Sequence, residues 1–199
     1  MKTKFSSLLE AIHALQKGRL IILVDDIHRE NEGDFVMAAE FATEKTINTM
    51  ITLGKGLVCA PISDTIAKKL DLPLMVKTNT ESFRTAFTVS IDAKTNTTGI
   101  SAQERADTLN QLANPNAKID DFVRPGHIFP LIGKAGGVQS RPGHTEASLA
   151  LMQLAKLKPV AVICEIILPN GKMARRQDLF KLATKLRMPI LEISQLMKP

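Results

Sequence analysis

Residues 25–34 read DDIHRENEGD and gather five carboxylates in a chain whose net charge is +6. Glu30, Glu32 and Asp34 are spaced by two, so an extended backbone would direct all three to one side. Converging carboxylate oxygens suit Mg²⁺ or Mn²⁺, and a cation would relieve their repulsion. The alternative is a solvated surface segment. We favour a metal or acid–base site, because apolar segments flank these residues. Repulsion among the carboxylates should leave residues 28–33 loosely held until a cation binds.

The tetrapeptide RPGH occurs at 124–127 and again at 141–144, where it runs directly into a helical pattern. A chance repeat is the alternative for any motif this short. A helix N-terminus offers free N–H groups and the positive end of a dipole, which together favour phosphate. The predicted phosphate-binding site consists of Arg141, Gly143 and a capping Thr145. His144 lies beside it and can bind a metal as neutral imidazole.

A carboxylate also interrupts the apolar segment VAVICEIIL at 160–168. Inside such a strand Glu165 must pair, bind a metal or take a raised pKa. A structural partnership with an arginine explains this residue equally well. Cys59 and Cys164 lie in similarly apolar segments and are expected to fill the core. His28 borders the acidic segment without an assignable role.

Helix and strand patterns alternate irregularly along the 199 residues. This order favours an α+β fold, with mixed or antiparallel strands flanked by helices, over strict βαβ repeats. No Pro-, Ser- or Gly-rich linker divides the chain, so we expect one domain over 1–199. The expected helices span 6–17, 43–53, 64–70, 101–113, a segment from about 145, and 177–187; the expected strands span 20–26, 34–40, 56–63, 85–92, 128–133, 160–168 and the closing ILEIS.

Composition excludes some classes of protein. No apolar run reaches the ~18 residues of a membrane span, and the first residues do not form a signal peptide. Two cysteines make no disulfide framework and suit the reducing cytoplasm. Basic residues are scattered and tryptophan and tyrosine are absent, which argues against nucleic acid as a partner. The mild positive charge favours a small anionic substrate.

Several segments, in this order along nearly the whole chain, resemble one known family, 3,4-dihydroxy-2-butanone-4-phosphate synthase of riboflavin biosynthesis. The matching segments are DDIHRENEGDF, GLVC, TAFTVSID, TTGISAQER, RPGHIFPL, GGVQSRPGHTEA and CEI. The resemblance implies a lyase that converts D-ribulose 5-phosphate to 3,4-dihydroxy-2-butanone 4-phosphate and formate. It also implies Mg²⁺ or Mn²⁺ as cofactor, with one or two ions per site. The expected assembly is a homodimer with shared active sites, in the stand-alone form without a second enzyme domain.

The resemblance also assigns roles to residues of this sequence. It implies that Glu30 and His144 bind the metal, and it leaves open whether these two segments meet across a subunit interface. It implies catalysis by His127 and Glu165, with Asp25 and Glu32 available for proton transfer. The implied substrate contacts are Arg29, Glu30, Asp34, Arg141, Pro142, Gly143, His144, Thr145 and Glu165.

Two rival functions use the same features. Another divalent-metal enzyme acting on sugar phosphates, such as an isomerase or an aldolase, needs similar side chains but releases no formate. A basic nucleic-acid-binding module would bind with a steep dependence on salt.

Overall fold

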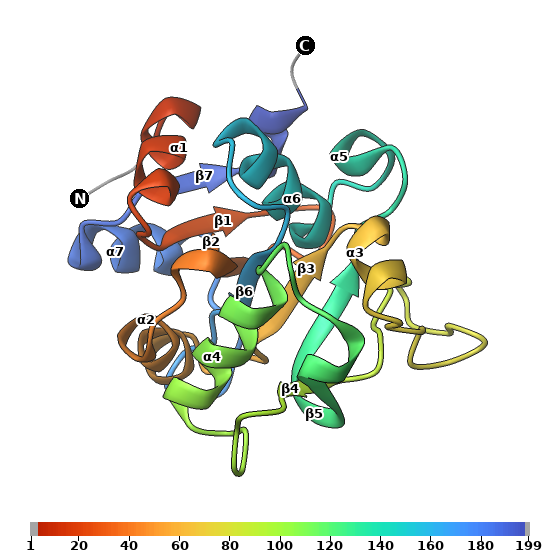
Figure 1. Cartoon of the computed structure of the whole chain (residues 1–199). Coiled ribbons are helices and arrows are strands. Elements are labelled where there is room, and N and C mark those ends of the chain that lie inside the picture. Colours follow the sequence, from red (N-terminus) through yellow and green to blue (C-terminus); the bar gives the residue numbers. More distant parts are fainter. Residues whose placement is uncertain (1–3, 198–199) are drawn as a thin grey trace.

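The computed structural model describes residues 4–197, in which seven strands form one mixed sheet (Figure 1). Their order across the sheet is β4-β5-β3-β6-β2-β1-β7. β1 pairs antiparallel with β2 and parallel with β7, so both strand directions occur within one sheet, as the α+β prediction required. The strands are β1 (Ile21–Val24), β2 (Gly33–Ala38), β3 (Cys59–Ile62), β4 (Ile91–Ala93), β5 (Phe122–Ile132), β6 (Ala161–Glu165) and β7 (Ile190–Glu192).

Helices cover both faces of this sheet (Figure 1). Leu15 and Leu151 belong to the apolar cluster on one face, beneath α1 and α6. Leu109 and Leu179 belong to the cluster on the other face, together with residues of α2. The helices are α1 (Leu8–Gln16), α2 (Glu44–Thr49), α3 (Asp64–Lys69), α4 (Ala102–Leu112), α5 (Gly137–Ser140), α6 (His144–Leu154) and α7 (Arg176–Leu186).

The centre of the sheet fixes the acidic segment in space. All four residues of β1 are buried because helices cover both sides of the strand. β1 and β2 are antiparallel neighbours, and residues 25–32 form the loop between them. β2 then pairs with β6, which places Asp34 directly opposite Glu165. Two carboxylates that lie 131 positions apart in sequence therefore share one end of the sheet.

Most expected elements are present, and the short helix α5 is an addition to them. Three of the expected elements differ in form. The expected strand at 85–92 contributes only β4 at its end, because the Phe87 N–H donates to the Thr85 carbonyl at 3.0 Å and leaves isolated bridges. The first RPGH copy lies inside β5, so the expected strand at 128–133 is longer than predicted. The helix expected over 43–53 changes after α2 to a π-helical turn at Met50–Gly54.

None of the helices in residues 4–197 is long and apolar enough to cross a bilayer.

Candidate active site

Asp25 organises the loop between β1 and β2. It is fully buried at the end of β1. Its Oδ1 accepts a hydrogen bond from the Glu32 N–H at 2.9 Å, and its Oδ2 accepts one from the Glu30 N–H at 3.0 Å. Arg29 Nη1 also lies 3.0 Å from Oδ2. Both oxygens of Asp25 thus hold the loop, while a role in proton transfer stays a prediction.

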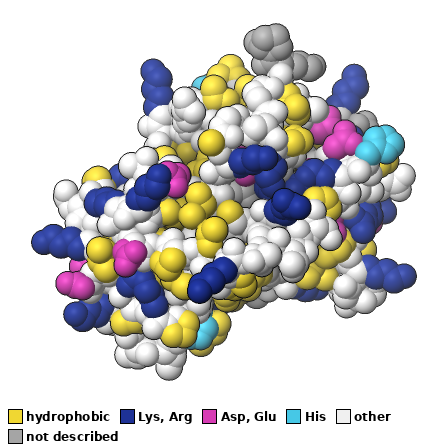
Figure 2. Space-filling view, turned by 90° about the vertical axis from the view of Figure 1, so that its right-hand side faces the viewer, with side chains coloured by type: hydrophobic (Ala, Val, Ile, Leu, Met, Phe, Trp, Pro, Cys, Tyr) yellow, Lys and Arg dark blue, Asp and Glu magenta, His cyan; other side chains and the backbone are white. Residues whose placement is uncertain are grey.

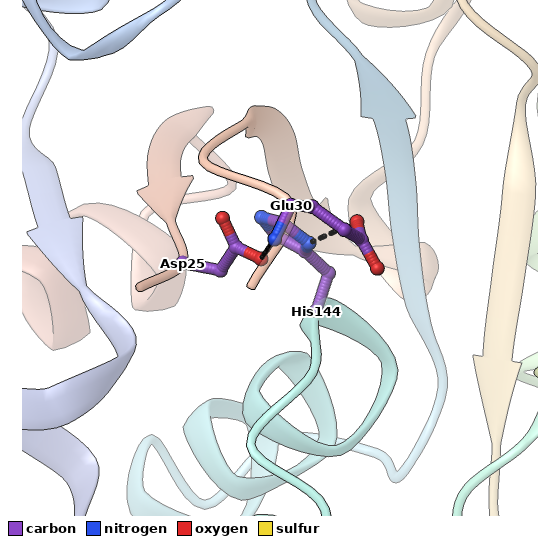
Figure 3. Close-up of side chains that lie close together, drawn as sticks. All are labelled: Asp25, Glu30 and His144. Atoms are coloured by element: carbon purple, nitrogen blue, oxygen red, sulfur yellow. Dashed lines mark hydrogen bonds and ion pairs between the residues drawn. The ribbon is translucent and has the colours of Figure 1, made fainter. Parts of the chain in front are cut away.

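Glu30 and His144 meet within one protomer (Figure 3). His144 is the first residue of α6, and its Nδ1 lies 3.8 Å from Glu30 Oε2. The two ligand segments therefore need no subunit interface to come together. The other oxygen of Glu30, Oε1, lies 2.7 Å from Arg29 Nη1. With Asp25, these side chains bring three ligand atoms within 4.8 Å of one another.

The electrostatics of this pair suit a cation. Burial lowers the pKa of His144 to about 4, against an opposing effect of Asp25, so the imidazole is neutral at physiological pH. Burial raises the pKa of Glu30, although Arg29 opposes that shift. A carboxylate oxygen is the kind of ligand that Mg²⁺ and Mn²⁺ prefer, and the neutral imidazole is the form of histidine that binds a metal.

The spacing of the pair also fits a metal ion. In an octahedron with bonds of ~2.1 Å, two ligand atoms lie roughly 3.0 Å apart when adjacent and about 4.2 Å apart when opposite. The 3.8 Å between Nδ1 and Oε2 is too long for a good hydrogen bond and lies between these two distances, so a shift of a few tenths of an ångström or more in either side chain would bring the pair to adjacent or opposite positions around an ion. Glu30 and His144 are therefore the residues that would hold the ion.

Asp34 and Glu165 form a second acidic pair on adjacent strands. Asp34 is 4% exposed, and its pKa is raised well above the usual range by burial and then by the Glu165 charge. Glu165 Oε2 accepts a hydrogen bond from the Leu57 N–H at 2.8 Å. A side chain at Gly56 would collide with the same oxygen. The carboxylate that interrupts an apolar strand is thus paired with a backbone N–H group, so the alternative of an arginine partner is not needed to explain it.

Glu32 departs from the predicted arrangement. Asn31 adopts a φ of 54°, so the loop is not extended and the three acidic residues do not share one direction. Glu32 lies 3.7 Å from Arg175 and does not line the pocket that Glu30 and Asp34 line. Burial raises the pKa of Glu32, with Arg175 opposing the shift.

The second RPGH copy forms the predicted start of α6, with one correction. Gly143, not Thr145, is the N-cap residue, and no side chain caps the helix. A Cβ on Gly143 would lie 2.5 Å from Arg141 Nη1 and 3.0 Å from Arg29 Nη2. Glycine therefore allows two guanidinium groups to approach the first turn, where N–H groups are free to bind an anion.

Arg141 is held from several directions. Its Nη1 lies 2.7 Å from the Glu146 carboxylate, and its Nη2 donates to Thr85 Oγ1 at 2.8 Å. Thr145 is buried beside it in the first turn of α6, after Pro142 and Gly143. These contacts fix the guanidinium in place before any ligand binds.

These groups surround a pocket of about 230 Å³. Arg141 and Thr145 also line a larger neighbouring cleft of about 1120 Å³, which has a mainly apolar wall. Seven of the fourteen residues that line the smaller pocket are not among the predicted site residues, and Glu81, Phe83 and Thr85 among them come from one segment. The TAFT segment signalled Thr85 through the strand expected over 85–92, whereas no periodic pattern runs through 72–84.

His127 lies outside this pocket. It lies on β5, where its Nδ1 is 2.7 Å from Asp92 Oδ2 and its ring is 44% exposed. Phe129 and Leu131 follow His127 at spacings of two along β5, so they share its face of the sheet, and they pack in the cluster beneath α6. Ile163 of the same cluster precedes Glu165 by two on β6. His127 and Glu165 therefore face the same side of the sheet, with β3 between their strands.

Fold and site together define an α+β protein with a carboxylate–imidazole ligand pair beside the N-terminus of a helix. More particularly, the family model of 3,4-dihydroxy-2-butanone 4-phosphate synthase matches residues 9–199. The chain belongs to this family.

Individual relatives agree with this membership. The riboflavin biosynthesis protein RibBA of Bacillus cytotoxicus is 53% identical over 192 residues, which cover 96% of this chain and 48% of the relative. The chain thus spans about half the length of the curated relatives it matches. A crystal structure of a 3,4-dihydroxy-2-butanone 4-phosphate synthase in complex with two magnesium ions matches with a TM-score of 0.94 and 38% identity, over 96% of this chain and 95% of that one. RibBX, a two-domain synthase from A. baumannii, matches with a TM-score of 0.93 and 46% identity, over 96% of this chain and 57% of that one.

Proposed function

We propose that the chain converts D-ribulose 5-phosphate to 3,4-dihydroxy-2-butanone 4-phosphate and formate, with Mg²⁺ or Mn²⁺ bound by Glu30 and His144. The observation that carries this proposal is the meeting of that ligand pair with two guanidinium groups at the first turn of α6. The reaction also balances without an oxidant or reductant. Five carbons become four plus one, and all the oxygen and hydrogen of the substrate is retained in the two products.

Substrate binding follows from the contacts of Arg29 and Arg141. Both guanidinium groups lie beside Gly143, and the free N–H groups of the first turn of α6 point to the same place. A phosphate there would receive charge-assisted hydrogen bonds from rigidly held donors. Thr145, buried in that turn, adds a hydroxyl.

The acidic pair at the end of the sheet, Asp34 and Glu165, takes part in proton transfer alongside His127. A bound divalent ion would supply positive charge that lowers the cost of negative charge developing on substrate oxygens. Burial and the Glu165 charge raise the pKa of Asp34, so this carboxyl is the member of the pair better suited to give a proton to the substrate. Glu165, whose oxygen accepts a bond from the Leu57 N–H, is the partner suited to accept protons.

The protein is further proposed to act as a homodimer in the cytoplasm, as one domain, with His127 completing an active site. Support for the dimer comes from the exposed apolar residues Leu74, Met75 and Val76 and from the position of His127 outside the pocket. Figure 2 shows hydrophobic side chains gathered, among Lys and Arg, on the face that lies to the right in Figure 1.

The experiment is to incubate the chain with ribulose 5-phosphate and Mg²⁺ and to follow the carbon species by NMR. We expect formate and a four-carbon phosphate to accumulate in equal amounts. A pentose or pentulose isomer without formate would instead identify an isomerase, and two shorter sugars would identify an aldolase. Tight binding of nucleic acid without turnover would refute the enzymatic proposal.

A further inference from the structure

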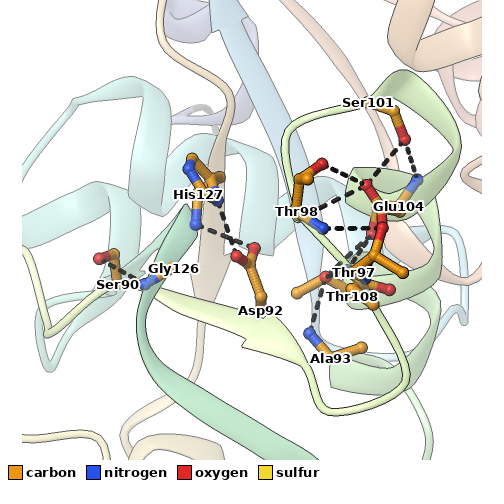
Figure 4. A network of polar contacts seen from close by, with 12 residues as sticks. Ser90, Asp92, Ala93, Thr97, Thr98, Ser101, Glu104, Thr108, Gly126 and His127 are labelled. Atoms are coloured by element: carbon orange, nitrogen blue, oxygen red, sulfur yellow. Dashed lines mark hydrogen bonds and ion pairs between the residues drawn. The ribbon is translucent and has the colours of Figure 1, made fainter.

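Asp92 is a buried carboxylate whose oxygens both face His127 (Figure 4). Its Oδ1 accepts a hydrogen bond from the His127 backbone N–H at 2.9 Å. Its Oδ2 lies 2.7 Å from Nδ1 of the imidazole ring. The carboxylate is 8% exposed while the ring is 44% exposed, so one edge of the ring is anchored and the other faces solvent.

The turn at 97–99 holds Asp92 in place. Gly99 has a φ of +77° and packs so closely on the carboxylate that a Cβ there would collide with Oδ2. Glu104 fixes the turn, because its carboxylate accepts hydrogen bonds from the backbone N–H groups of Thr97 and Gly99 at 2.6 Å and 3.1 Å. In Figure 4 this network, with Glu104 at its centre, lies on the far side of Asp92 from the ring. The carboxylate therefore has no room to turn away from His127.

This geometry determines the form of the imidazole. An ionised carboxylate only accepts hydrogen bonds, so the 2.7 Å contact requires a proton on Nδ1. In the neutral ring Nε2 then carries the free lone pair, at the edge away from Asp92. A ring with the opposite tautomer would set two lone pairs against each other in a nearly dry contact.

We propose that Asp92 is a positioning residue for His127, which fixes the Nδ1–H tautomer and presents Nε2 as the group that takes a proton from the substrate and returns it. This inference rests on the proposed function, in which His127 acts in catalysis. Asp92 fixes the tautomer of His127 in the same way whether the imidazole acts in the pocket of its own protomer or in that of a partner.

The direct test is the tautomer of His127 in the wild-type protein, measured by two-dimensional ¹⁵N–¹H NMR of imidazole-labelled protein above pH 7.5. A His127→Gln sample assigns the signal. We expect a protonated Nδ1 and an unprotonated Nε2. A ring protonated mainly on Nε2 would overturn the inference. The measurement needs no substrate, so failure to produce formate would refute the proposed function and leave this result standing.

The second test is Asp92→Asn, because an amide cannot replace both acceptor oxygens. If the amide oxygen keeps the bond from the His127 N–H, its NH₂ group faces Nδ1 and favours the opposite tautomer. We expect kcat to fall about 100-fold with KM within about twofold, since general acid–base catalysis contributes that much. The tautomer signal should change in the same sample.

The matched control is Ser90→Ala. Ser90 Oγ accepts a hydrogen bond from the Gly126 N–H at 3.1 Å, so this change removes one bond to the same segment without touching the ring. We expect kcat to stay within about threefold of wild type and the tautomer to be unchanged. Equal losses of kcat in both variants, or an Asp92→Asn effect on KM alone, would assign Asp92 a merely structural role.

Discussion

Arg29 Nη1 lies 2.7 Å from Glu30 Oε1 and 3.0 Å from Asp25 Oδ2, so a guanidinium occupies the space between two carboxylates for which a divalent cation would compete. The guanidinium also lies over the Phe83 ring, 4.7 Å from its centroid. We therefore expect Arg29→Gln to bind Mn²⁺ more tightly in the absence of substrate. Release of one partly buried ion pair, roughly 1 kcal/mol, corresponds to about fivefold in Kd. Titration followed by electron paramagnetic resonance measures free Mn²⁺.

Arg141→Gln is the control for this prediction. It removes an equal charge near the site, but Arg141 pairs with Glu146 and makes no ion pair with Glu30. If only Arg29→Gln binds Mn²⁺ more tightly, the Arg29 guanidinium competes directly with the cation. If both variants bind Mn²⁺ more tightly by the same factor, the cause is only the loss of positive charge near the site. Weaker Mn²⁺ binding by Arg29→Gln would contradict the prediction.

Asp34→Asn should stabilise the metal-free protein at neutral pH. Burial raises the pKa of Asp34 well above its ordinary value of 3.8, so the folded state holds this proton more tightly than the unfolded chain does. Stability therefore falls as pH rises from 3.8 toward the folded-state pKa, and it is retained below 3.8. An uncharged amide at this position removes the loss of folding stability that the buried carboxyl causes at neutral pH. Thermal unfolding in EDTA should show a Tm a few degrees higher at pH 7.5 and a shrinking difference toward pH 4, although activity is lost.

Glu32→Gln provides the comparison for Asp34, because Glu32 lies in the same segment but is partly exposed beside Arg175. We expect a smaller change in Tm. A lower Tm for Asp34→Asn than for wild type at pH 7.5 would show that the charge of Asp34 is stabilised by contacts other than those described.

The loop at 25–32 should be protected from hydrogen exchange even without metal. The amides of Glu30 and Glu32 donate to Asp25, and the His28 amide donates to Asp26 Oδ1 at 2.8 Å. Asp25→Asn leaves only one acceptor oxygen, so the Glu30 and Glu32 amides should exchange about tenfold faster or more. Mass spectrometry of peptides spanning the loop measures the rates.

Asp26→Asn is the matched control, because it keeps an acceptor oxygen for the His28 amide. It should leave exchange in the loop close to wild type. Rapid exchange of the loop amides in the wild-type protein until Mg²⁺ is added would contradict this prediction. It would support the loosely held loop that charge repulsion alone leads one to expect.

Arg141→Lys should raise KM about tenfold with a smaller effect on kcat. Lysine keeps the charge but cannot contact Glu146 and Thr85 with two nitrogens at once. The ammonium is therefore less well placed to bind phosphate. Steady-state kinetics with ribulose 5-phosphate, together with calorimetric titration of inorganic phosphate, measures the change.

The first RPGH copy supplies the control. Arg124 Nη2 donates to the Leu70 carbonyl at 2.7 Å and lies outside the pocket. Arg124→Lys should leave KM close to wild type. An unchanged KM in Arg141→Lys would remove Arg141 from the substrate contacts.

Local patterns in the sequence predicted most of the elements. Ser7, Ser63 and Ser101 each begin a helix as N-cap residues, and the apolar segments on either side of the acidic loop form paired strands. These features depend on neighbouring residues, so a sequence displays them. The meeting of Glu30 with His144 needed the family resemblance, because no local pattern relates the two segments.

Local sequence patterns did not predict the contacts between distant residues or the direction of the loop side chains. The positive φ of Asn31 turns Glu32 away from Glu30, although their spacing by two suggested a common direction. The contact of Asp92 with His127 joins positions 35 residues apart through a β-bulge. The spacing of Ser101 and Glu104 is typical of a capping box, but only the Ser101 side chain caps the helix, and the Glu104 carboxylate binds the 97–99 turn.

The most direct measurement is formate release by the wild-type chain and by Glu30→Gln and His144→Asn, each with Mg²⁺ and with EDTA. Both variants remove one ligand of the proposed ion and keep a polar side chain of similar size. We predict one formate per ribulose 5-phosphate consumed by the wild type with Mg²⁺, and none with EDTA or from either correctly folded variant. Formate release that persists in EDTA, or in either variant at the wild-type rate, would contradict this prediction.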